Sequence, residues 1–244
     1  MSMIRLAHIS KTYAGTHKAV DNLDWEIEEG TITGFIGPNG AGKTTTLKMI
    51  TGILEPDEDG SIEINGIDIG KNPVEAKRQF GFVSDSPDNF LRLKGIEYLN
   101  FMADLYDVPT KERKERIASF ASRFEMENAL KDRILSYSHG MRQKIMVMGA
   151  LLHNPSVWIL DEPLTGLDPK SAFALKEMMK EHAAAGKSVL FSTHVLEVAE
   201  KLCDRIAVIN KGKIVYRGTL DDLRKQFREG ESLEEIFLSM TKDA

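Results

Sequence analysis

The sequence predicts an α/β fold in which a core with a parallel β-sheet carries an N-terminal antiparallel β-subdomain and an inserted α-helical subdomain. Three changes of hydrophobic pattern along the chain support this prediction. Strand-like runs fill residues 1–36, apolar residues at helical spacing fill 95–130, and strands alternate with helices from 155 onward. Because such alternation is typical of parallel βαβ units, the helical stretch is expected to interrupt one core.

The N-terminal part is expected to be rich in β-structure. Residues 4–9 and 23–27 indicate two strands, which Gly15 and Gly30 separate from the segments that follow. The apolar run 32–36 indicates a third strand, and its lack of charged residues predicts that this strand is buried.

The middle of the chain combines one hairpin with a helical segment. Residues 61–69 alternate in polarity around the pair Asn65 and Gly66, which is typical of a two-residue hairpin turn. Further on, two apolar stripes predict helices, one made by Leu99, Met102 and Tyr106 and the other by Ile117, Phe120, Ala121 and Phe124. The charged run 111–116 between them is expected to be a solvated helix face, not a binding patch.

The last part is expected to alternate strands with helices within a single domain. Strands are expected at 157–160, 188–192 and 206–209, and helices at 170–185 and 196–202. We expect residues 1–86 and 151–218 to form the core, 87–150 the helical subdomain, and 219–244 a C-terminal helical tail.

Composition narrows the class of protein. The 244 residues include 32 basic and 37 acidic side chains, a net charge of −5, which argues against sequence-independent binding of nucleic acid. Cys203 is the single cysteine, so no internal disulfide can form and a reducing compartment is expected. The longest apolar run, 145–152, is too short to cross a bilayer, and the start of the sequence lacks an apolar signal segment. We therefore expect a cytoplasmic protein.

The most informative feature is a glycine-rich run between the strand expected at 32–36 and the helix expected to start at 45. It fits the pattern Gly, four residues, Gly, Lys, Ser/Thr of a phosphate-binding loop, or P-loop. Glycines let backbone N–H groups converge on phosphate oxygens, and the helix N-terminus adds its positive dipole end. Lys43 would reach the β- and γ-phosphates and Thr44 would bind Mg²⁺. The predicted nucleotide-binding residues are Gly37, Pro38, Asn39, Gly40, Ala41, Gly42, Lys43, Thr44 and Thr45.

Two adjacent carboxylates, Asp161 and Glu162, follow the strand expected at 157–160. Because α/β sheets place ligands at the C-terminal ends of their strands, both side chains are expected beside the phosphate loop. Asp161 would hold Mg²⁺ directly or through a water, since a metal on phosphate oxygens needs a hard anionic partner. Glu162 is then free to orient or deprotonate an attacking water. The sequence thus predicts a P-loop core that binds Mg²⁺ and a nucleotide with β- and γ-phosphates.

With these motifs the chain resembles the ATP-binding cassette family over almost its whole length. Tyr13 matches the aromatic residue that stacks on adenine, and His194 matches the switch histidine that contacts the γ-phosphate. Asp168 ends the run that matches the family's dimer loop. The resemblance implies catalytic roles for Lys43, Glu162 and His194. The signature that binds the partner subunit's γ-phosphate corresponds to Ser138, His139, Gly140 and Met141.

The chain departs from the usual family pattern in two places. Asp85 stands where the family usually has glutamine, so it is a third candidate metal residue beside Thr44 and Asp161. The competing interpretation is that Asp85 caps the turn at 86–89. In the signature, His139 replaces a usual glycine and Met141 a usual glutamine. Similar variants occur in cassettes of bacterial exporters with separately encoded membrane subunits, and the tail at 232–237 is similar to theirs.

The resemblance implies the ATP-hydrolysing subunit of a membrane transporter, most often an exporter, on the cytoplasmic face of the membrane. Its partners would be integral membrane permease subunits and a second cassette, either another copy or a related chain, that closes an ATP sandwich. Nucleic acid is not an expected partner. The alternative is a soluble cassette ATPase acting on ribosomes or DNA, and a P-loop kinase or nucleotide switch would leave the signature and His194 unexplained.

A surface for the membrane subunit is expected after Asp85. Apolar side chains are frequent there for a loop and helix facing water, and in the family this region receives a short helix of the membrane subunit. The competing interpretation is that they seal the helical subdomain onto the core. The residues concerned are Phe90, Leu91, Leu93, Tyr98 and Phe101.

Overall fold

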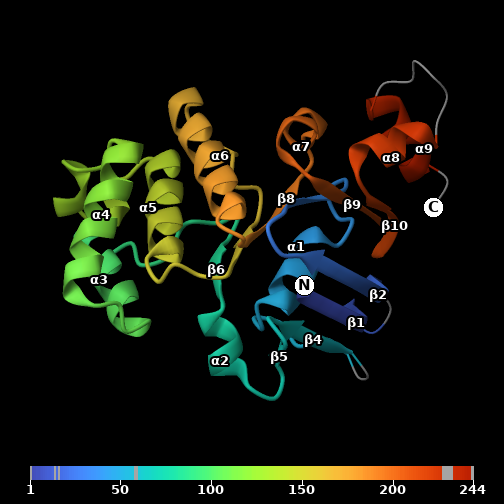
Figure 1. Ribbon diagram of the computed structural model, residues 1–244, viewed down its shortest axis with the longest axis horizontal. Coiled ribbons are helices and arrows are strands. Elements are labelled where there is room, and N and C mark those ends of the chain that lie inside the picture. The colour runs from blue at the N-terminus through green and yellow to red at the C-terminus, as the bar shows by residue number, and fades with distance from the viewer. Residues whose placement is uncertain (1, 14, 16, 58–59, 227–232, 243–244) are drawn as a thin grey trace.

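The predicted α/β fold class is confirmed by a computed structural model, which describes residues 2–13, 15, 17–57, 60–226 and 233–242. Two sheets form its centre, and helices cover them (Figure 1). Helices α3, α4 and α5 gather at one end of the molecule, and the tail helices α8 and α9 lie at the opposite end. Among the described residues, no helix combines the length and apolar character needed to cross a membrane.

The central sheet has six strands in the order β10-β9-β3-β8-β7-β6. All neighbours in it are parallel except β9 and β10, which form an antiparallel pair at one edge. Every residue of β3, β7 and β8 is buried, which explains why these strands are nearly continuous apolar runs. The strands are β3 (Ile32–Ile36), β6 (Phe80–Val83), β7 (Val157–Leu160), β8 (Ser188–Thr193), β9 (Arg205–Asn210) and β10 (Lys213–Gly218).

The second sheet is antiparallel, in the order β2-β1-β4-β5. The predicted hairpin joins β4 to β5, with Asn65 and Gly66 both at positive φ, as a type I′ turn requires. Trp25 packs on Phe35 with ring centroids 4.8 Å apart, which fastens this sheet to the central one. The strands are β1 (Ser2–Tyr13), β2 (His17–Glu28), β4 (Ser61–Ile64) and β5 (Ile67–Asp68).

Four helices belong to the core. Helix α1 begins at Lys43, earlier than expected, directly after the phosphate loop, and it buries Leu47, Met49 and Ile50 in the cluster that includes Trp25 and Phe35. This packing places the start of α1 beside the C-terminal end of β3. The four helices are α1 (Lys43–Ile50), α2 (Pro73–Arg78), α6 (Pro169–Ala184) and α7 (Leu196–Leu202).

The helical segment lies between β6 and β7 in the chain. It consists of α3 (Gly95–Leu105), α4 (Thr110–Phe124) and α5 (His139–Leu151), with 3₁₀ turns at Ala129–Lys131 and Ile134–Ser136. Both predicted apolar stripes meet in one cluster with the buried face of α5. In the run 111–116, Lys111, Glu112, Lys114 and Glu115 are exposed, as expected for a solvated helix face.

The tail helices pack beside α7. They are α8 (Leu220–Lys225) and α9 (Leu233–Lys242), and they share a small apolar cluster with α7, β3 and β9. An ion pair between Arg224 of α8 and Glu200 of α7 adds a polar contact. Of the tail segment that resembles exporter cassettes, Ser232 lies outside the described residues.

Candidate active site

Backbone packing explains the glycines of the phosphate loop, which joins β3 to α1. Gly42 has φ +110, and a Cβ atom there would lie 2.4 Å from the carbonyl oxygen of Ala19. A Cβ atom on Gly37 would lie 2.5 Å from the carbonyl oxygen of Ile209. Gly40 also has a positive φ, of +80, in a region that side chains rarely adopt. Any side chain at positions 37 or 42 would therefore displace the loop.

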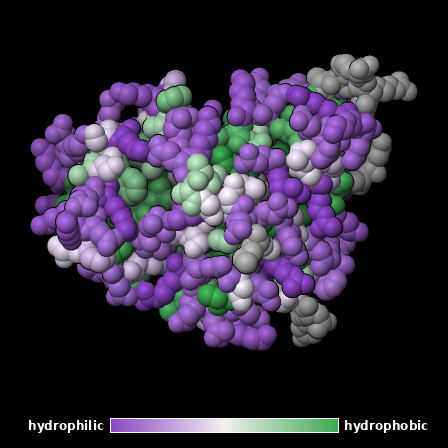
Figure 2. Space-filling model, in the orientation of Figure 1, coloured by the Kyte–Doolittle hydropathy of each residue, from purple (hydrophilic) through white to green (hydrophobic). Residues whose placement is uncertain are grey.

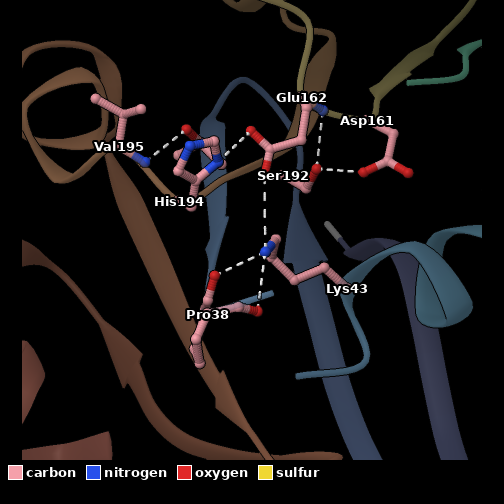
Figure 3. A network of polar contacts seen from close by, with 9 residues as sticks. Pro38, Lys43, Asp161, Glu162, Ser192, His194 and Val195 are labelled. Atoms are coloured by element: carbon pink, nitrogen blue, oxygen red, sulfur yellow. Dashed lines mark hydrogen bonds and ion pairs between the residues drawn. The ribbon is translucent and has the colours of Figure 1, made fainter. Parts of the chain in front are cut away.

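The side chain of Lys43, the first residue of α1, reaches back to the carbonyl groups of this loop (Figure 3). Its Nζ donates to the carbonyl oxygens of Gly37 at 2.7 Å and Pro38 at 3.2 Å, and it lies 3.6 Å from Oε1 of Glu162. Burial lowers the pKa of Lys43, and the carboxylates of Glu162 and Asp161 oppose that effect. The ammonium group is thus held between loop carbonyls and a carboxylate, in a position where it could bind a phosphate group in the loop.

Asp161 directly follows β7 and is almost fully buried, with 1% of its surface exposed. Its Oδ1 accepts a hydrogen bond from Ser192 Oγ at 2.5 Å, whereas its Oδ2 is buried without a hydrogen-bond partner. Burial raises the pKa of Asp161, and the charges of Asp85 and Glu162 raise it further, while the hydroxyls of Ser192 and Thr44 act in the opposite direction. An unpartnered buried carboxylate oxygen beside a hydroxyl suits a hard cation.

These residues fit Mg²⁺ only together with a nucleotide. Among the described residues, no group of three or more His, Cys, Asp or Glu side chains could hold a metal ion by itself. Mg²⁺ sites in nucleotide-hydrolysing proteins need no such group, because phosphate oxygens and waters supply most ligands. Asp161 Oδ2 and the Thr44 hydroxyl could supply the protein's share of such a site.

Glu162 and His194 form the other half of the polar network in Figure 3. Glu162 Oε2 lies 3.0 Å from His194 Nδ1, and the Glu162 backbone N–H donates to Ser192 Oγ at 3.0 Å. Glu162 has φ +47, a conformation that non-glycine residues rarely adopt and that clusters at functional sites. Its carboxylate is therefore held between Lys43 and His194, and its backbone is tied to Ser192.

A pocket of about 320 Å³ opens next to this network. Its lining brings together Tyr13, the phosphate loop, Asp85 and Glu162. Tyr13, at the end of β1, is 40% exposed and so has a ring face available to a ligand. The carboxylate of Asp85 accepts a hydrogen bond from the Ser84 hydroxyl at 3.0 Å. The Ser86 N–H, which a capping Asp85 would be expected to bind, is directed at Ser84 Oγ at 3.4 Å.

The signature residues do not line this pocket but form a unit of their own. Ser138 caps α5, accepting a hydrogen bond from the Met141 N–H at 3.2 Å. A Cβ atom on Gly140 would lie 2.8 Å from the Gly166 carbonyl oxygen, and one on Gly166 would lie 2.5 Å from the His139 ring. The signature thus packs tightly against the predicted dimer loop of the same chain.

Asp168 ends that dimer loop and caps α6. Its carboxylate accepts hydrogen bonds from the Ser171 N–H at 2.9 Å and the Ser171 hydroxyl at 2.6 Å, and it pairs with Lys144 Nζ at 3.2 Å. These contacts, those to Ser171 first, lower the pKa of Asp168. Because Lys144 belongs to α5, the pair also ties the signature helix to the dimer loop.

Arg142 of the signature helix makes a second link, to the loop that follows Asp85. Its Nη1 lies 2.5 Å from Asp88 Oδ1, and its Nη2 donates to the Leu135 carbonyl oxygen at 3.0 Å. The loop at the pocket and the signature helix are therefore joined within one chain.

Sequence reasoning missed three residues that the site contains. His17 and Ala19 line the pocket, and Ser192 contacts both Asp161 and Glu162. Ser192 lies 31 positions from Asp161 in the chain, so no helical or strand periodicity in the sequence indicates that they are in contact. Only the parallel pairing of β7 with β8 brings them together.

Comparison with known proteins gives consistent sequence matches. The sequence model of the ABC transporter family matches residues 20–165. The ABC-type transporter ATP-binding protein EcsA of Bacillus subtilis is 36% identical over 244 residues, which covers 100% of this chain and 98% of that protein. The Nod factor export ATP-binding protein I of Cupriavidus metallidurans is 33% identical over 222 residues, which covers 91% of this chain and 73% of that protein.

Solved structures agree with these matches. A structure described as the ATP-binding subunit of an ABC transporter has a TM-score of 0.93 and 35% identity, covering 99% of this chain and 100% of that one. A dimeric structure of the ATP-binding cassette MJ0796, in a post-hydrolysis state bound to ADP and Pi, has a TM-score of 0.80 and 25% identity, covering 89% of this chain and 99% of that one.

Proposed function

This chain belongs to the family of ABC transporter ATP-binding subunits and is an ATPase, and we propose that its ATP site is the pocket bounded by Tyr13, the phosphate loop and Glu162. The observation that carries the proposal is the network of Lys43, Asp161, Glu162 and His194, which converges at the edge of this pocket. The adenine would stack on Tyr13, and the phosphates would lie in the loop.

Each residue of the network has a distinct role in ATP hydrolysis. Lys43 Nζ exchanges its loop carbonyl partners for β- and γ-phosphate oxygens. Thr44 and Asp161 would hold Mg²⁺, which when bound neutralises charge that develops on the phosphates. Glu162 orients a water and takes its proton as the water oxygen attacks the γ-phosphorus and the bond to the β-phosphate breaks. His194 orients the Glu162 carboxylate through Nδ1 and is proposed to contact the γ-phosphate through its other ring nitrogen.

Two cassettes are needed to complete the site. The signature residues lie outside the pocket of their own chain, and Ser138 at the N-terminus of α5 is suited to an anion from elsewhere. We propose that a second copy or a related cassette presents its signature to this pocket, so that each ATP lies between two chains. The dimeric relative with ADP and Pi supports this arrangement.

A membrane subunit is proposed to dock on the aromatic surface after Asp85. Of the residues predicted there, Tyr98 is buried, Leu91 and Leu93 pack against the core, and Phe90 and Phe101 are 45% and 46% exposed. The two exposed rings are 5.7 Å apart, and Phe90 has φ +56, rare for a bulky residue. In the view of Figure 2 most of the surface is polar, with an apolar area beside α4 and α5. Residues 87–150 would thus form the docking subdomain, within which the pair of Arg142 and Asp88 links the loop after Asp85 to the signature helix.

The substitutions Phe90→Glu and Phe101→Glu are each expected to uncouple transport from ATP hydrolysis. A charge at a half-exposed ring disfavours burial by a partner, while leaving the chain's own core intact. We expect loss of copurification with the membrane subunit and of transport, with ATPase activity of the isolated chain within about 2-fold of the original, since exposed substitutions cost little stability. Phe173→Glu, at a ring 66% exposed on α6, is the control. Unfolding of the isolated Phe90→Glu and Phe101→Glu proteins would instead support the packing interpretation.

Asp85→Gln tests whether Asp85 acts at the metal. The carboxylate adds negative charge beside Asp161, so its removal should weaken divalent binding and lower the pKa of Asp161 in the metal-free protein. We expect a several-fold higher Mg²⁺ concentration for half-maximal hydrolysis, with metal-free ATP binding unchanged or slightly tighter. Asp221→Asn, at an exposed site on α8, is the control. An unmoved Mg²⁺ midpoint with a lowered melting temperature would favour the capping interpretation.

The exporter assignment and the location at the cytoplasmic face of the membrane are also proposals. They rest on the altered signature, on the similar tail and on similarity to a protein named for Nod factor export. Affinity purification from membranes, followed by ATP-dependent transport in vesicles of both orientations, tests them. Recovery with ribosomes or DNA, and without a membrane subunit, would favour the alternative class of cassette.

A further inference from the structure

We propose that Ser192 is a positioning residue that orients both acidic groups of the ATP site, an inference that rests on the roles proposed for Asp161 and Glu162. Ser192 lies on β8, is fully buried, and stands two positions before His194 in the chain. Figure 3 shows its hydroxyl between the two acidic residues. Among the described residues, no other side-chain hydroxyl forms hydrogen bonds with both Asp161 and Glu162.

The two hydrogen bonds of Ser192 differ in direction. Its hydroxyl donates its one proton to Asp161 Oδ1 at 2.5 Å, and the same oxygen accepts the Glu162 backbone N–H at 3.0 Å. A hydroxyl can serve both contacts at once because it carries one donor and two acceptor positions. Alanine could make neither contact, and threonine could make both.

The contact to Asp161 decides which carboxylate oxygen is available to a metal. With Oδ1 occupied by Ser192, the unpartnered Oδ2 remains for the Mg²⁺ that accompanies ATP. Without the hydroxyl, the Asp161 carboxylate could rotate and would present its oxygens less reproducibly. We therefore expect Ser192→Ala to weaken the response to Mg²⁺ and the binding of ATP together with Mg²⁺, and to leave the binding of metal-free ATP unchanged.

The contact to Glu162 supports an uncommon backbone conformation. Glu162 has φ +47, and the hydrogen bond from its N–H to Ser192 ties that backbone to β8. The Glu162 side chain leaves this backbone to reach His194, which also follows β8. Small losses of alignment at a general base reduce turnover strongly, because proton transfer requires hydrogen-bond distance. Turnover should fall in Ser192→Ala together with the metal response.

The test compares Ser192→Ala and Ser192→Thr with the matched control Ser188→Ala. Ser188 is also fully buried on β8, but its hydroxyl donates to the Glu28 carbonyl oxygen at 2.7 Å, away from the acidic groups. Each protein is assayed for kcat, for the Mg²⁺ midpoint of hydrolysis, for ATP affinity by calorimetry with and without Mg²⁺, and for melting temperature.

We expect Ser192→Ala to lower kcat by about 10- to 100-fold, as loss of paired partners for buried polar groups at a catalytic centre predicts. Its Mg²⁺ midpoint should rise several-fold, and ATP affinity should fall with Mg²⁺ but not without it. Ser192→Thr should retain most of the original kcat and a nearly original Mg²⁺ midpoint. Ser188→Ala should change neither kcat nor the Mg²⁺ midpoint. If Ser192→Ala does not fold, Ser192→Cys, which keeps the volume but donates weakly, should show the same pattern in smaller measure.

Two results would overturn the inference. One is a Ser192 variant with unchanged kcat and Mg²⁺ midpoint. The other is a fall in kcat that follows melting temperature equally in Ser192→Ala and Ser188→Ala, with no metal effect, which would mean a purely structural role. Failure of the proposed function is a separate outcome, because it would appear as undiminished turnover in Glu162→Gln, whatever Ser192 does.

Discussion

Replacing Glu162 by glutamine is expected to lower ATP turnover by a factor of about 10²–10⁴, the usual contribution of a general base. The amide has nearly the same shape and can keep the contact with His194, but it cannot take a proton from water. Lys43, Thr44 and Asp161 remain in place, so ATP binding should persist. The protein should therefore accumulate as an ATP-bound dimer in the presence of Mg²⁺.

Phosphate release and gel filtration with ATP together measure this outcome. Glu115→Gln, at an exposed position on α4, carries the same change of charge far from the network and should behave like the original protein. Near-normal hydrolysis by Glu162→Gln would show that another group accepts the proton. Loss of ATP binding would show instead that Glu162 is needed to hold Lys43 in place.

Lys43→Met is expected to lower ATP affinity by about 10²–10⁴-fold. Each hydrogen bond from a charged donor to phosphate contributes about 1.5–3 kcal/mol, and Lys43 is positioned to supply two. Methionine keeps the apolar part of the buried side chain and removes the ammonium group. Calorimetry with ATP, with and without Mg²⁺, measures the change, and the two conditions should show similar losses because Lys43 acts on phosphate directly.

Lys48→Met is the matched control, since Lys48 lies in the last turn of the same helix and outside the lining of the pocket. It should bind ATP normally. A small effect of Lys43→Met on affinity would contradict the assignment of this pocket. A large drop in melting temperature without nucleotide would show that the contacts of Lys43 with Gly37 and Pro38 also support the fold.

The fold class and the order of the elements could be predicted because their signals are local. The buried strand β3, the hairpin at Asn65 and the helical stripes of α3 and α4 each follow from a short stretch of side chains. Element bounds were harder to predict: the first helix was expected to start at residue 45, whereas α1 begins at Lys43, directly after Gly42. Roles at the site, including that of Asp85, stay predictions until the variants above are measured.

Exposure within an apolar segment could not be predicted from the sequence. Tyr98 and Phe101 are only three positions apart on α3, yet Tyr98 is 3% exposed and Phe101 is 46% exposed. The ring of Tyr98 packs on Gly149 of α5, a neighbour that hydrophobic spacing does not identify. The proposed docking surface is therefore smaller than the apolar segment that suggested it.

The sequence by itself determined the chemistry that this protein carries: a glycine loop between a strand and a helix, a lysine and threonine at the helix start, and two carboxylates at a strand end. Those features depend on backbone conformations and side-chain types within a few residues of one another. Tertiary structure alone decided that Ser192 joins Asp161 to Glu162, and that the signature lies outside the pocket of its own chain. These relations depend on which strands become neighbours in the sheet, and β8 pairs with β7 through contacts between segments far apart in the chain.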